Sequence, residues 1–338
     1  MRKVWIEVAL NGPWSRALQP GIPDTVEAII AEGIACARAG AAIIHTHAYD
    51  GGGPQTFDWQ VYARIIEGIR AEVDVPVYPS FPAFMIGSGD AGVAEAEARF
   101  SHIDALAARG LIEIAALDPG SVNFTQIATT SQANPAGTYL NPESHIRHAL
   151  GIAERHGFHP AFAIYEPGFI RAGAALARAT GVKTPIYRFM FSQQFAFCFP
   201  PKPYALAALA TLVEEEAGAA PWMISGLGVD VSPLIGEAVA RGGHIRVGLE
   251  DALLGTPAST TNLGLVEAAV QIVRDHGAEP ATPDDVRQAL GAISDGGGLV
   301  SPVSWKWRAT VATNTLSRIV NGGREDGLSN IEANDPEP

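Results

Sequence analysis

The chain alternates between short apolar runs and longer amphipathic stretches, and this alternation limits its possible folds more than any other feature. Apolar residues at three- and four-residue spacing, often closed by glycine, predict helices over residues 23–40, 57–73, 91–110, 142–157, 168–181, 203–218, 232–243 and 261–277. Runs rich in Val, Ile, Phe and Ala predict strands over residues 4–10, 41–47, 75–81, 112–118, 159–166, 187–192, 222–228 and 244–251.

Strands that are apolar on both faces and separated by helices form parallel sheets, and eight such units close a barrel. An open doubly wound sheet is the alternative, but its first strand should lead into a GxGxxG turn. Here that strand runs into Asn11-Gly12-Pro13-Trp14. The sequence therefore predicts an α/β fold, a (β/α)8 TIM barrel, over residues 1–292. Residues 293–338, which include Trp305 and Trp307, are expected to form a partly flexible C-terminal extension.

The composition narrows the class of protein. Hydrophobic residues make up 47% of the chain and the formal charge is −13, which favours a packed globular protein and excludes nucleic acid as a partner. The two cysteines show no metal-binding or disulfide spacing. No apolar run reaches the length of a membrane span and no leader pattern is visible, so we expect a cytoplasmic protein without membrane association. We also expect a homo-oligomer, a dimer or tetramer.

Two histidines stand at the end of the second predicted strand. His45 and His47 are two residues apart, so their imidazoles point to one face at the carboxyl end of the strand. Active sites of such barrels lie at that end. One interpretation is a pair of packed or hydrogen-bonded histidines. The shared face favours a second interpretation, in which both bind a metal ion.

The eighth predicted strand supplies a third ligand candidate, Glu250, at the same end of the barrel. Two imidazoles and one carboxylate form the open site typical of catalytic zinc, although iron and manganese use similar sets. Arg246 should point into the barrel and requires an acid there. Asp251 is the nearest acid in the sequence, and Ser80, at the end of the third strand, could join by hydrogen bonding. The alternative is a purely structural internal salt bridge.

Other residues at the strand ends carry weaker signals. Asn11, Tyr49, Asp118 and Glu166 are candidates for substrate binding, although such groups also cap helices and close turns. The small residues of SGLG at 225–228 could present backbone amides to a phosphate. The remaining histidines of helices and their ends are expected at the surface: His102, His145, His148, His156, His159 and His276. His244 begins the eighth strand at the opposite end, where residues serve stability.

With these motifs in view, the chain resembles the β-keto acid cleavage enzyme family, as a divergent member similar to 3-keto-5-aminohexanoate cleavage enzymes. GGHIRVGLED carries the resemblance most strongly, followed by GAAIIHTH and by TNLGLVEAAV with EPATPDDVRQALG; PGSVNF and YEPG add to it. The resemblance implies a zinc-binding barrel that converts a β-keto acid and acetyl-CoA, its cosubstrate, into acetoacetate and a new acyl-CoA.

The resemblance also assigns roles. It implies His45, His47 and Glu250 as zinc ligands, and Ser80, Arg246 and Asp251 as a hydrogen-bonded catalytic set. Glu166 corresponds to an acid near the substrate. Zinc would stabilise an enolate, and Asp251 would take the proton from the carbon between the two carbonyls. A retro-Claisen step would then release the products.

The chain departs from the family pattern at several positions. Tyr49 replaces a common arginine, Ala116 stands in place of a hydroxyl residue, and Asp118 in place of an amide. Trp14 replaces the acid that binds the substrate amine in the aminohexanoate enzymes. An amino-substituted keto acid is therefore not expected as substrate. Two alternatives stay open: a metal-dependent aldolase, decarboxylase or hydrolase that acts on a keto acid without CoA, and a non-catalytic barrel that binds metal and ligand.

Overall fold

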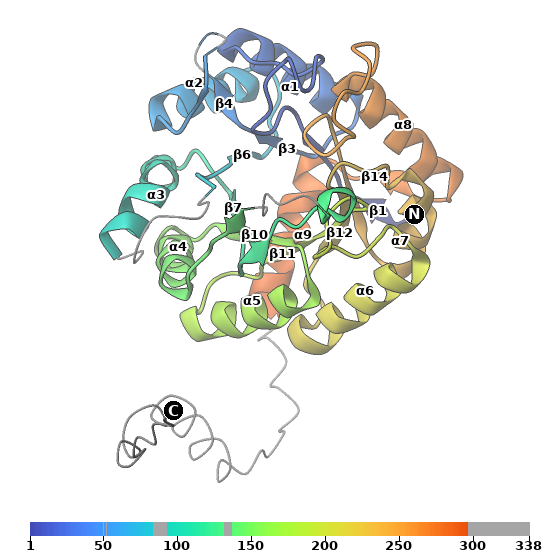
Figure 1. Ribbon diagram of the computed structural model, residues 1–338. Helices are drawn as coiled ribbons and strands as arrows, with labels where there is room; N and C mark the ends of the chain where they lie inside the picture. Colours follow the sequence, from blue (N-terminus) through green and yellow to red (C-terminus); the bar gives the residue numbers. More distant parts are fainter. Residues whose placement is uncertain (50, 52, 84–92, 132–136, 297–338) are drawn as a thin grey trace, which may run out of the picture. The chain divides into compact units, whose positions relative to one another are not determined.

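The predicted strands form one parallel sheet. The structure is a computed structural model that describes residues 1–49, 51, 53–83, 93–131 and 137–296 (Figure 1). Its eight-stranded sheet has the order β6-β3-β2-β13-β12-β11-β10-β7, and β6 and β7, at the two ends of this order, lie next to each other. The strands are β2 Ile6–Ala9, β3 Ile43–Thr46, β6 Val77–Pro79, β7 Ile114–Leu117, β10 His159–Ile164, β11 Ile186–Phe191, β12 Trp222–Gly226 and β13 His244–Val247. The predicted TIM barrel is confirmed.

Helices surround the strands in chain order, as Figure 1 shows. They are α1 Val26–Ala39, α2 Trp59–Arg70, α3 Val93–Ala107, α4 Glu143–His156, α5 Pro167–Thr180, α6 Pro203–Ala217, α7 Ile235–Arg241 and α8 Asn262–Asp275. The hydroxyls of Thr25 and Thr261 cap α1 and α8 by accepting from backbone N–H groups of the first turn. A further helix, α9 Pro283–Gly296, follows the eighth unit, and the strand–helix alternation did not predict it.

Short strand pairs complete the described part of the chain. The first predicted strand is divided, since β1 Lys3–Val4 pairs with β14 Glu279–Pro280 and only β2 enters the barrel. β4 Ala48–Tyr49 pairs with β5 Gln55–Thr56, and β8 Val122–Asn123 pairs with β9 Thr138–Tyr139. Two 3-10 turns lie at Ile127–Thr129 and Ser232–Leu234. Because β4 and β8 follow barrel strands, both hairpins lie at the carboxyl end of the sheet.

The inside of the barrel carries charge where branched apolar side chains would usually fill it. Glu7 on β2, Arg188 on β11 and Arg246 on β13 are 1%, 4% and 2% exposed. Burying such groups is unfavourable unless each finds a partner. The barrel interior is therefore built around a polar network, and this network leads to the site described below.

Several histidines lie elsewhere than predicted. His102, His145 and His159 are buried, whereas their positions on helices or helix ends predicted exposure. His102 lies on α3 and packs against the ring of Tyr62. His244 is also buried, stacked on Trp5 at the amino-terminal end of the barrel, which agrees with its predicted structural role.

The expected C-terminal extension, with Trp305 and Trp307, lies outside the described residues apart from the last turn of α9. Within the described residues, none of the helices combines the length and the apolar character that a membrane crossing requires.

Candidate active site

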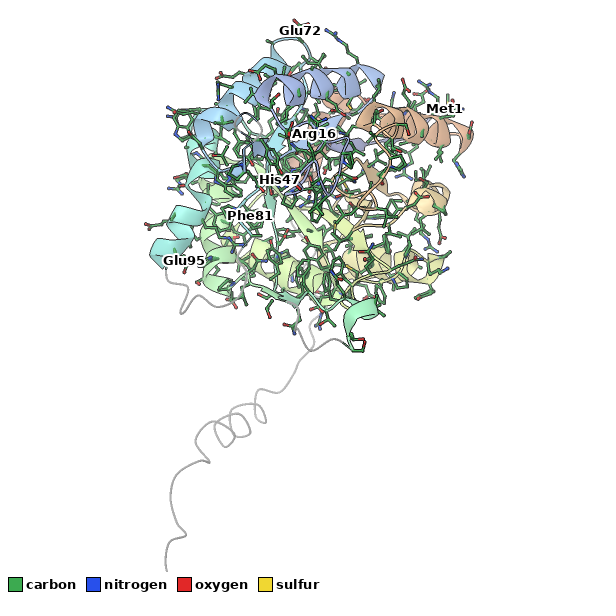
Figure 2. All side chains as sticks on the ribbon, turned by 45° about the horizontal axis from the view of Figure 1, so that its top comes forward. Met1, Arg16, His47, Glu72, Phe81 and Glu95 are labelled. Carbon is green, nitrogen blue, oxygen red and sulfur yellow. The ribbon has the colours of Figure 1, made fainter. Side chains whose placement is uncertain are left out.

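Three predicted metal ligands meet at the carboxyl end of the barrel. His45 on β3 and His47 just after it lie beside Glu250, which follows β13, with β2 between the two strands. The Nε2 atoms of His45 and His47 lie 3.4 and 3.6 Å from the two carboxylate oxygens of Glu250. Figure 2 shows His47 towards the middle of the barrel, away from Glu72 and Glu95 at the helical periphery.

These separations fit a divalent metal ion. Zinc bonds of about 2.0–2.1 Å at tetrahedral angles place neighbouring ligand atoms roughly 3.3 Å apart. One carboxylate oxygen of Glu250, Oε2, is buried without a hydrogen-bond partner among the described residues. Such an oxygen is unfavourable unless a cation or donor satisfies it. The donor set and the unsatisfied oxygen therefore fit an ion bound by His45, His47 and Glu250.

The protonation states suit metal binding as well. Burial lowers the pKa of His45 to about 4, so its imidazole is neutral at pH 7. Burial alone would raise the pKa of Glu250, but the positive charge of Arg246 beside it opposes burial, and the pKa lies well below its usual range. A neutral imidazole and an ionised carboxylate are the forms that bind a metal ion.

Arg246 connects the metal ligands to a second carboxylate. Its Nε and Nη2 donate to the two oxygens of Asp251 over 2.7 and 3.0 Å. Nη2 also donates to Glu250 over 2.9 Å, and Nη1 donates to Glu7 over the same distance. The predicted pairing of Arg246 with Asp251 is thus present, and it is bidentate. One guanidinium fixes both the ligand Glu250 and the free acid Asp251.

Ser225 occupies the place expected for Ser80. The hydroxyl of Ser225 donates to Asp251 over 2.8 Å, because β12 neighbours β13 and places the two side chains together. Among the described residues, no hydrogen bond joins the Ser80 hydroxyl to Arg246 or Asp251. The Ser80 carbonyl lies 2.8 Å from Nε2 of His102. Ser80 still lines the same cavity as Asp251.

The SGLG segment does not offer its amides to a phosphate. The N–H groups of Leu227 and Gly228 donate to the carbonyls of Phe191 and Asp251. These donors are engaged within the protein, so the segment supports the strand ends. The segment contributes the hydroxyl of Ser225, which bonds Asp251, and the side chain of Leu227, which lines the cavity.

Backbone geometry brings the end of β13 close to β2, the strand that lies between the two ligand-bearing strands. Gly248 has a φ of 141°, and a Cβ there would lie 2.0 Å from the carbonyl oxygen of Ala9. Only glycine fits this close approach of the β13 end to β2. The turn that follows then presents Glu250 to His45 and His47.

Asn11 and Tyr49 hold this backbone through hydrogen bonds. Asn11 accepts from the backbone N–H of His47 over 2.9 Å and donates to the carbonyls of His47 and Pro23. The Tyr49 hydroxyl donates to the Gly12 carbonyl over 2.6 Å, with the Trp14 carbonyl at 3.0 Å. These polar groups are engaged within the protein, and the substrate-binding role of Asn11 and Tyr49 stays a prediction.

A cavity of about 290 Å³ opens next to the metal ligands. Its lining includes the ligands, Asp251, Arg246, Ser80 and Asp118, so these predicted residues do come together. Glu166 is not part of the lining. It lies at the start of α5, immediately after the cavity residue Tyr165, and its contact with a substrate stays a prediction.

A larger hollow of about 910 Å³ opens near the amino-terminal end of the barrel, beside Trp5, Arg241 and His244. Barrel enzymes place their chemistry at the other end. The smaller cavity contains the cluster of candidate metal ligands, so we assign the site to it.

Sequence reasoning missed four buried residues of the site: Glu7, Tyr78, Arg188 and Ser225. Tyr78 donates to Glu7 over 2.6 Å and lies 3.4 Å from both Arg188 and Arg246. A signal was available for two of them, because Glu7 and Arg188 are single charged residues inside otherwise apolar strands. Such a charge must find a partner within the barrel.

Known proteins share this fold and sequence pattern. The solved ternary complex of ObcA with C4-CoA adduct and oxalate superposes with a TM-score of 0.58 at 18% identity, covering 80% of this chain and 68% of that chain, which shows the fold alone. The 3-keto-5-aminohexanoate cleavage enzyme of Fusobacterium nucleatum is 28% identical over 295 residues, 86% of this chain and 98% of the relative.

The 3-dehydrocarnitine:acetyl-CoA trimethylamine transferase of Rhizobium meliloti is also 28% identical, over 313 residues, covering 86% of this chain and 96% of the relative. Residues 3–292 match the family described as beta-keto acid cleavage enzyme. This match includes the histidine pair and the Arg246–Asp251 segment. The chain therefore belongs to the β-keto acid cleavage enzyme family.

Proposed function

We propose that this protein is a zinc-dependent enzyme that converts a β-keto acid and acetyl-CoA into acetoacetate and a new acyl-CoA. The observation that carries the proposal is a single cavity that holds the His45, His47 and Glu250 cluster together with Asp251, a carboxylate held by Arg246. Family membership supports the reaction class. Acetyl-CoA as cosubstrate is supported by the name of the Rhizobium relative.

Asp251 is the proposed base. Burial raises the pKa of its carboxyl group, against the opposing effect of the Arg246 hydrogen bonds, so it accepts a proton more readily than a surface aspartate. A divalent ion on His45, His47 and Glu250 would supply Lewis acidity to the keto and carboxylate oxygens of the substrate. Asp251 adjoins Glu250 and faces the same cavity, where it would take a proton from C2.

The carbon–carbon and thioester bonds of the two substrates would then be exchanged. The C2 electron pair attacks the acetyl carbonyl carbon, and the CoA thiolate leaves. The thiolate adds to the original C3 carbonyl of the keto acid, and the C2–C3 bond breaks with its electron pair returning to C2. Asp251 returns the proton to C2, which gives acetoacetate and the new acyl-CoA. The two hydrogen bonds from Arg246 hold Asp251 in one orientation during both proton transfers.

Ser80 and Asp118 are the proposed substrate contacts among the residues predicted from sequence. Both line the cavity, Ser80 next to the metal ligands and Asp118 just after β7. Arg246 is a positioning residue, since its donors are engaged with Glu7, Glu250 and Asp251.

Incubation of the metal-loaded full chain with a panel of β-keto acids, with and without acetyl-CoA, tests the proposal. We expect consumption only when acetyl-CoA is present, and loss of consumption in Asp251→Asn. Consumption without acetyl-CoA would instead identify an aldolase, decarboxylase or hydrolase. Calorimetric binding of metal and keto acid without any product would identify a non-catalytic barrel. Either result would overturn the proposal.

A further inference from the structure

We propose that the keto acid carries an uncharged, apolar side chain, which is selected by the cavity wall across the barrel mouth from the metal ligands. This inference rests on the proposed function and specifies its substrate. β10 lies across the ring from β2, so the ends of β7, β10 and β11 face the ligand-bearing strands. We define the far wall by the apolar cavity residues of this side: Ala116, Phe124, Tyr139, Ala163, Tyr165 and Met190.

Packed aromatic rings form most of the far wall. Tyr139 meets Phe124 and Tyr165 edge to face, with ring centroids 6.0 and 6.1 Å apart. Phe197 supports Tyr165 from its other side at 5.6 Å. Edge-to-face contacts of this kind are favourable and hold the rings in place. Beside them, the short side chains of Ala116 and Ala163 leave room for a substrate chain.

The two charged residues on this side compensate each other. Asp118 accepts from the Tyr139 hydroxyl over 2.7 Å and from the Ala163 N–H over 3.3 Å, and its Oδ1 lies 4.0 Å from Arg188. Arg188 donates to the Ala161 carbonyl over 3.1 Å. Both residues are almost completely buried. A substrate charge entering here would be a third, uncompensated charge in a buried place, which is strongly unfavourable.

One donor of Arg188 lacks a partner among the described residues, but a substrate cannot use it. Nε of Arg188 is enclosed by protein and has essentially no accessible surface. The enclosed position of Nε therefore gives no reason to expect an acidic substrate side chain. Trp14 adds apolar surface beside the ligands, because its indole N–H is used by the Glu250 carbonyl.

Three β-keto acids with six carbon atoms test this inference. 3-Oxohexanoate is neutral beyond its keto acid group, 3-oxoadipate adds a carboxylate, and 3-keto-5-aminohexanoate adds an ammonium group. The ammonium compound is the most demanding comparison for the neutral acid, because aromatic rings also attract cations. With metal-loaded full chain and acetyl-CoA, we expect kcat/KM for 3-oxohexanoate to exceed that of each charged acid at least tenfold.

Calorimetry separates the two proposals. The dissociation constants of the same three acids for the metal-loaded protein rank the preference for the substrate side chain, even if none of the acids reacts. Turnover of none would contradict the proposed function, while the order of binding still tests the far wall. The inference on the side chain is overturned if the neutral acid neither binds nor reacts better than either charged acid.

Two variants probe the compensated pair directly. Tyr139→Phe keeps the ring but removes the donor from Asp118, so the preference against the ammonium acid should fall about tenfold. Asp118→Asn removes one of the negative charges beside Arg188, so the preference against 3-oxoadipate should fall instead. Tyr204→Phe, at an exposed position on α6, is the control, and its substrate order should match the wild type. Unchanged ratios in both test variants would contradict the inference.

Discussion

The indole nitrogen of Trp14 donates a hydrogen bond of 2.9 Å to the backbone carbonyl of the candidate metal ligand Glu250. The Tyr49 hydroxyl holds the same loop through the carbonyls of Gly12 and Trp14. Trp14 and Tyr49 are therefore joined in one hydrogen-bonded brace beside the candidate metal ligands.

Removal of this brace should weaken metal binding. Trp14→Phe retains an aromatic ring but loses the N–H, and groups that orient ligands typically contribute 10- to 100-fold in metal affinity. We expect zinc affinity, measured by competition with a chromogenic chelator, to fall about tenfold. Trp59→Phe, on the outer helix α2, is the matched control and should bind as the wild type does. Equal affinities for both variants would mean that the brace has no effect on the site.

Asp251→Asn should abolish turnover and leave the metal in place. The amide cannot accept the proton from C2, and general bases contribute about 10²–10⁴-fold to rates. We expect kcat to fall by about that factor while the metal content, measured by atomic emission, stays at the wild-type level. Asp275→Asn, at the exposed end of α8, is the control and should change neither quantity. Retention of kcat in Asp251→Asn would exclude Asp251 as the base.

Arg246→Met should strongly destabilise the fold. The variant leaves Glu7, Glu250 and Asp251 without the cation that they share. Loss of one partner from a buried pair lowers the free energy of unfolding by about 3–5 kcal/mol. The surface pair Arg38–Glu72 supplies the comparison, since Arg38→Met should lower it by less than about 1 kcal/mol. Chemical denaturation measures the free energy of unfolding of both variants. An equally small decrease in both would show that the buried network contributes little to stability.

Stability should fall in mild acid because His102 is buried. Burial lowers the pKa of His102 to about 4, against the hydrogen bond to the Ser80 carbonyl, from an ordinary value of 6.5. Between pH 6.5 and 4 the unfolded chain therefore binds a proton that the folded chain does not. The free energy of unfolding falls with pH there, by up to about 1.4 kcal/mol per pH unit for each such histidine.

Denaturation at several pH values, with chelator present to remove the effect of metal release, isolates this contribution. His102→Gln should reduce the slope of the free energy of unfolding against pH between pH 6 and 4.5. The reduction should correspond to about one bound proton. His276→Gln, at an exposed position after α8, should keep the wild-type slope. Identical slopes for the wild type and His102→Gln would contradict the buried, neutral state of His102.

The fold could be predicted from sequence because each unit carries its own signal. Apolar strands and glycine-terminated helices are local patterns, and eight repeats of them are compatible with few topologies. The local sequence pattern predicts a strand less well when the strand it pairs with lies far away along the chain. β1 separates from β2 because Lys3 and Val4 pair with Glu279 and Pro280, a pairing that residues 4–10 alone cannot reveal.

The candidate site could be predicted only in part, for a related reason. His45 and His47 share a strand, and Glu250 and Asp251 follow another, so period-two geometry places them at one end of the barrel. The family resemblance implies Ser80 beside Asp251, but Ser80 follows β6, which β3 and β2 separate from β13. Ser225 lies on β12, the direct neighbour of β13, and therefore reaches Asp251.

Labelled acetyl-CoA tests the central claim most directly. The metal-loaded protein would receive a β-keto acid and acetyl-CoA with ¹³C in both acetyl carbons, and mass spectrometry would follow the products. The proposed bond changes predict acetoacetate labelled only in its acetyl carbons, C3 and C4, together with an unlabelled acyl-CoA derived from the keto acid. Unlabelled acetoacetate, or keto acid consumption with acetyl-CoA unchanged, would contradict the account.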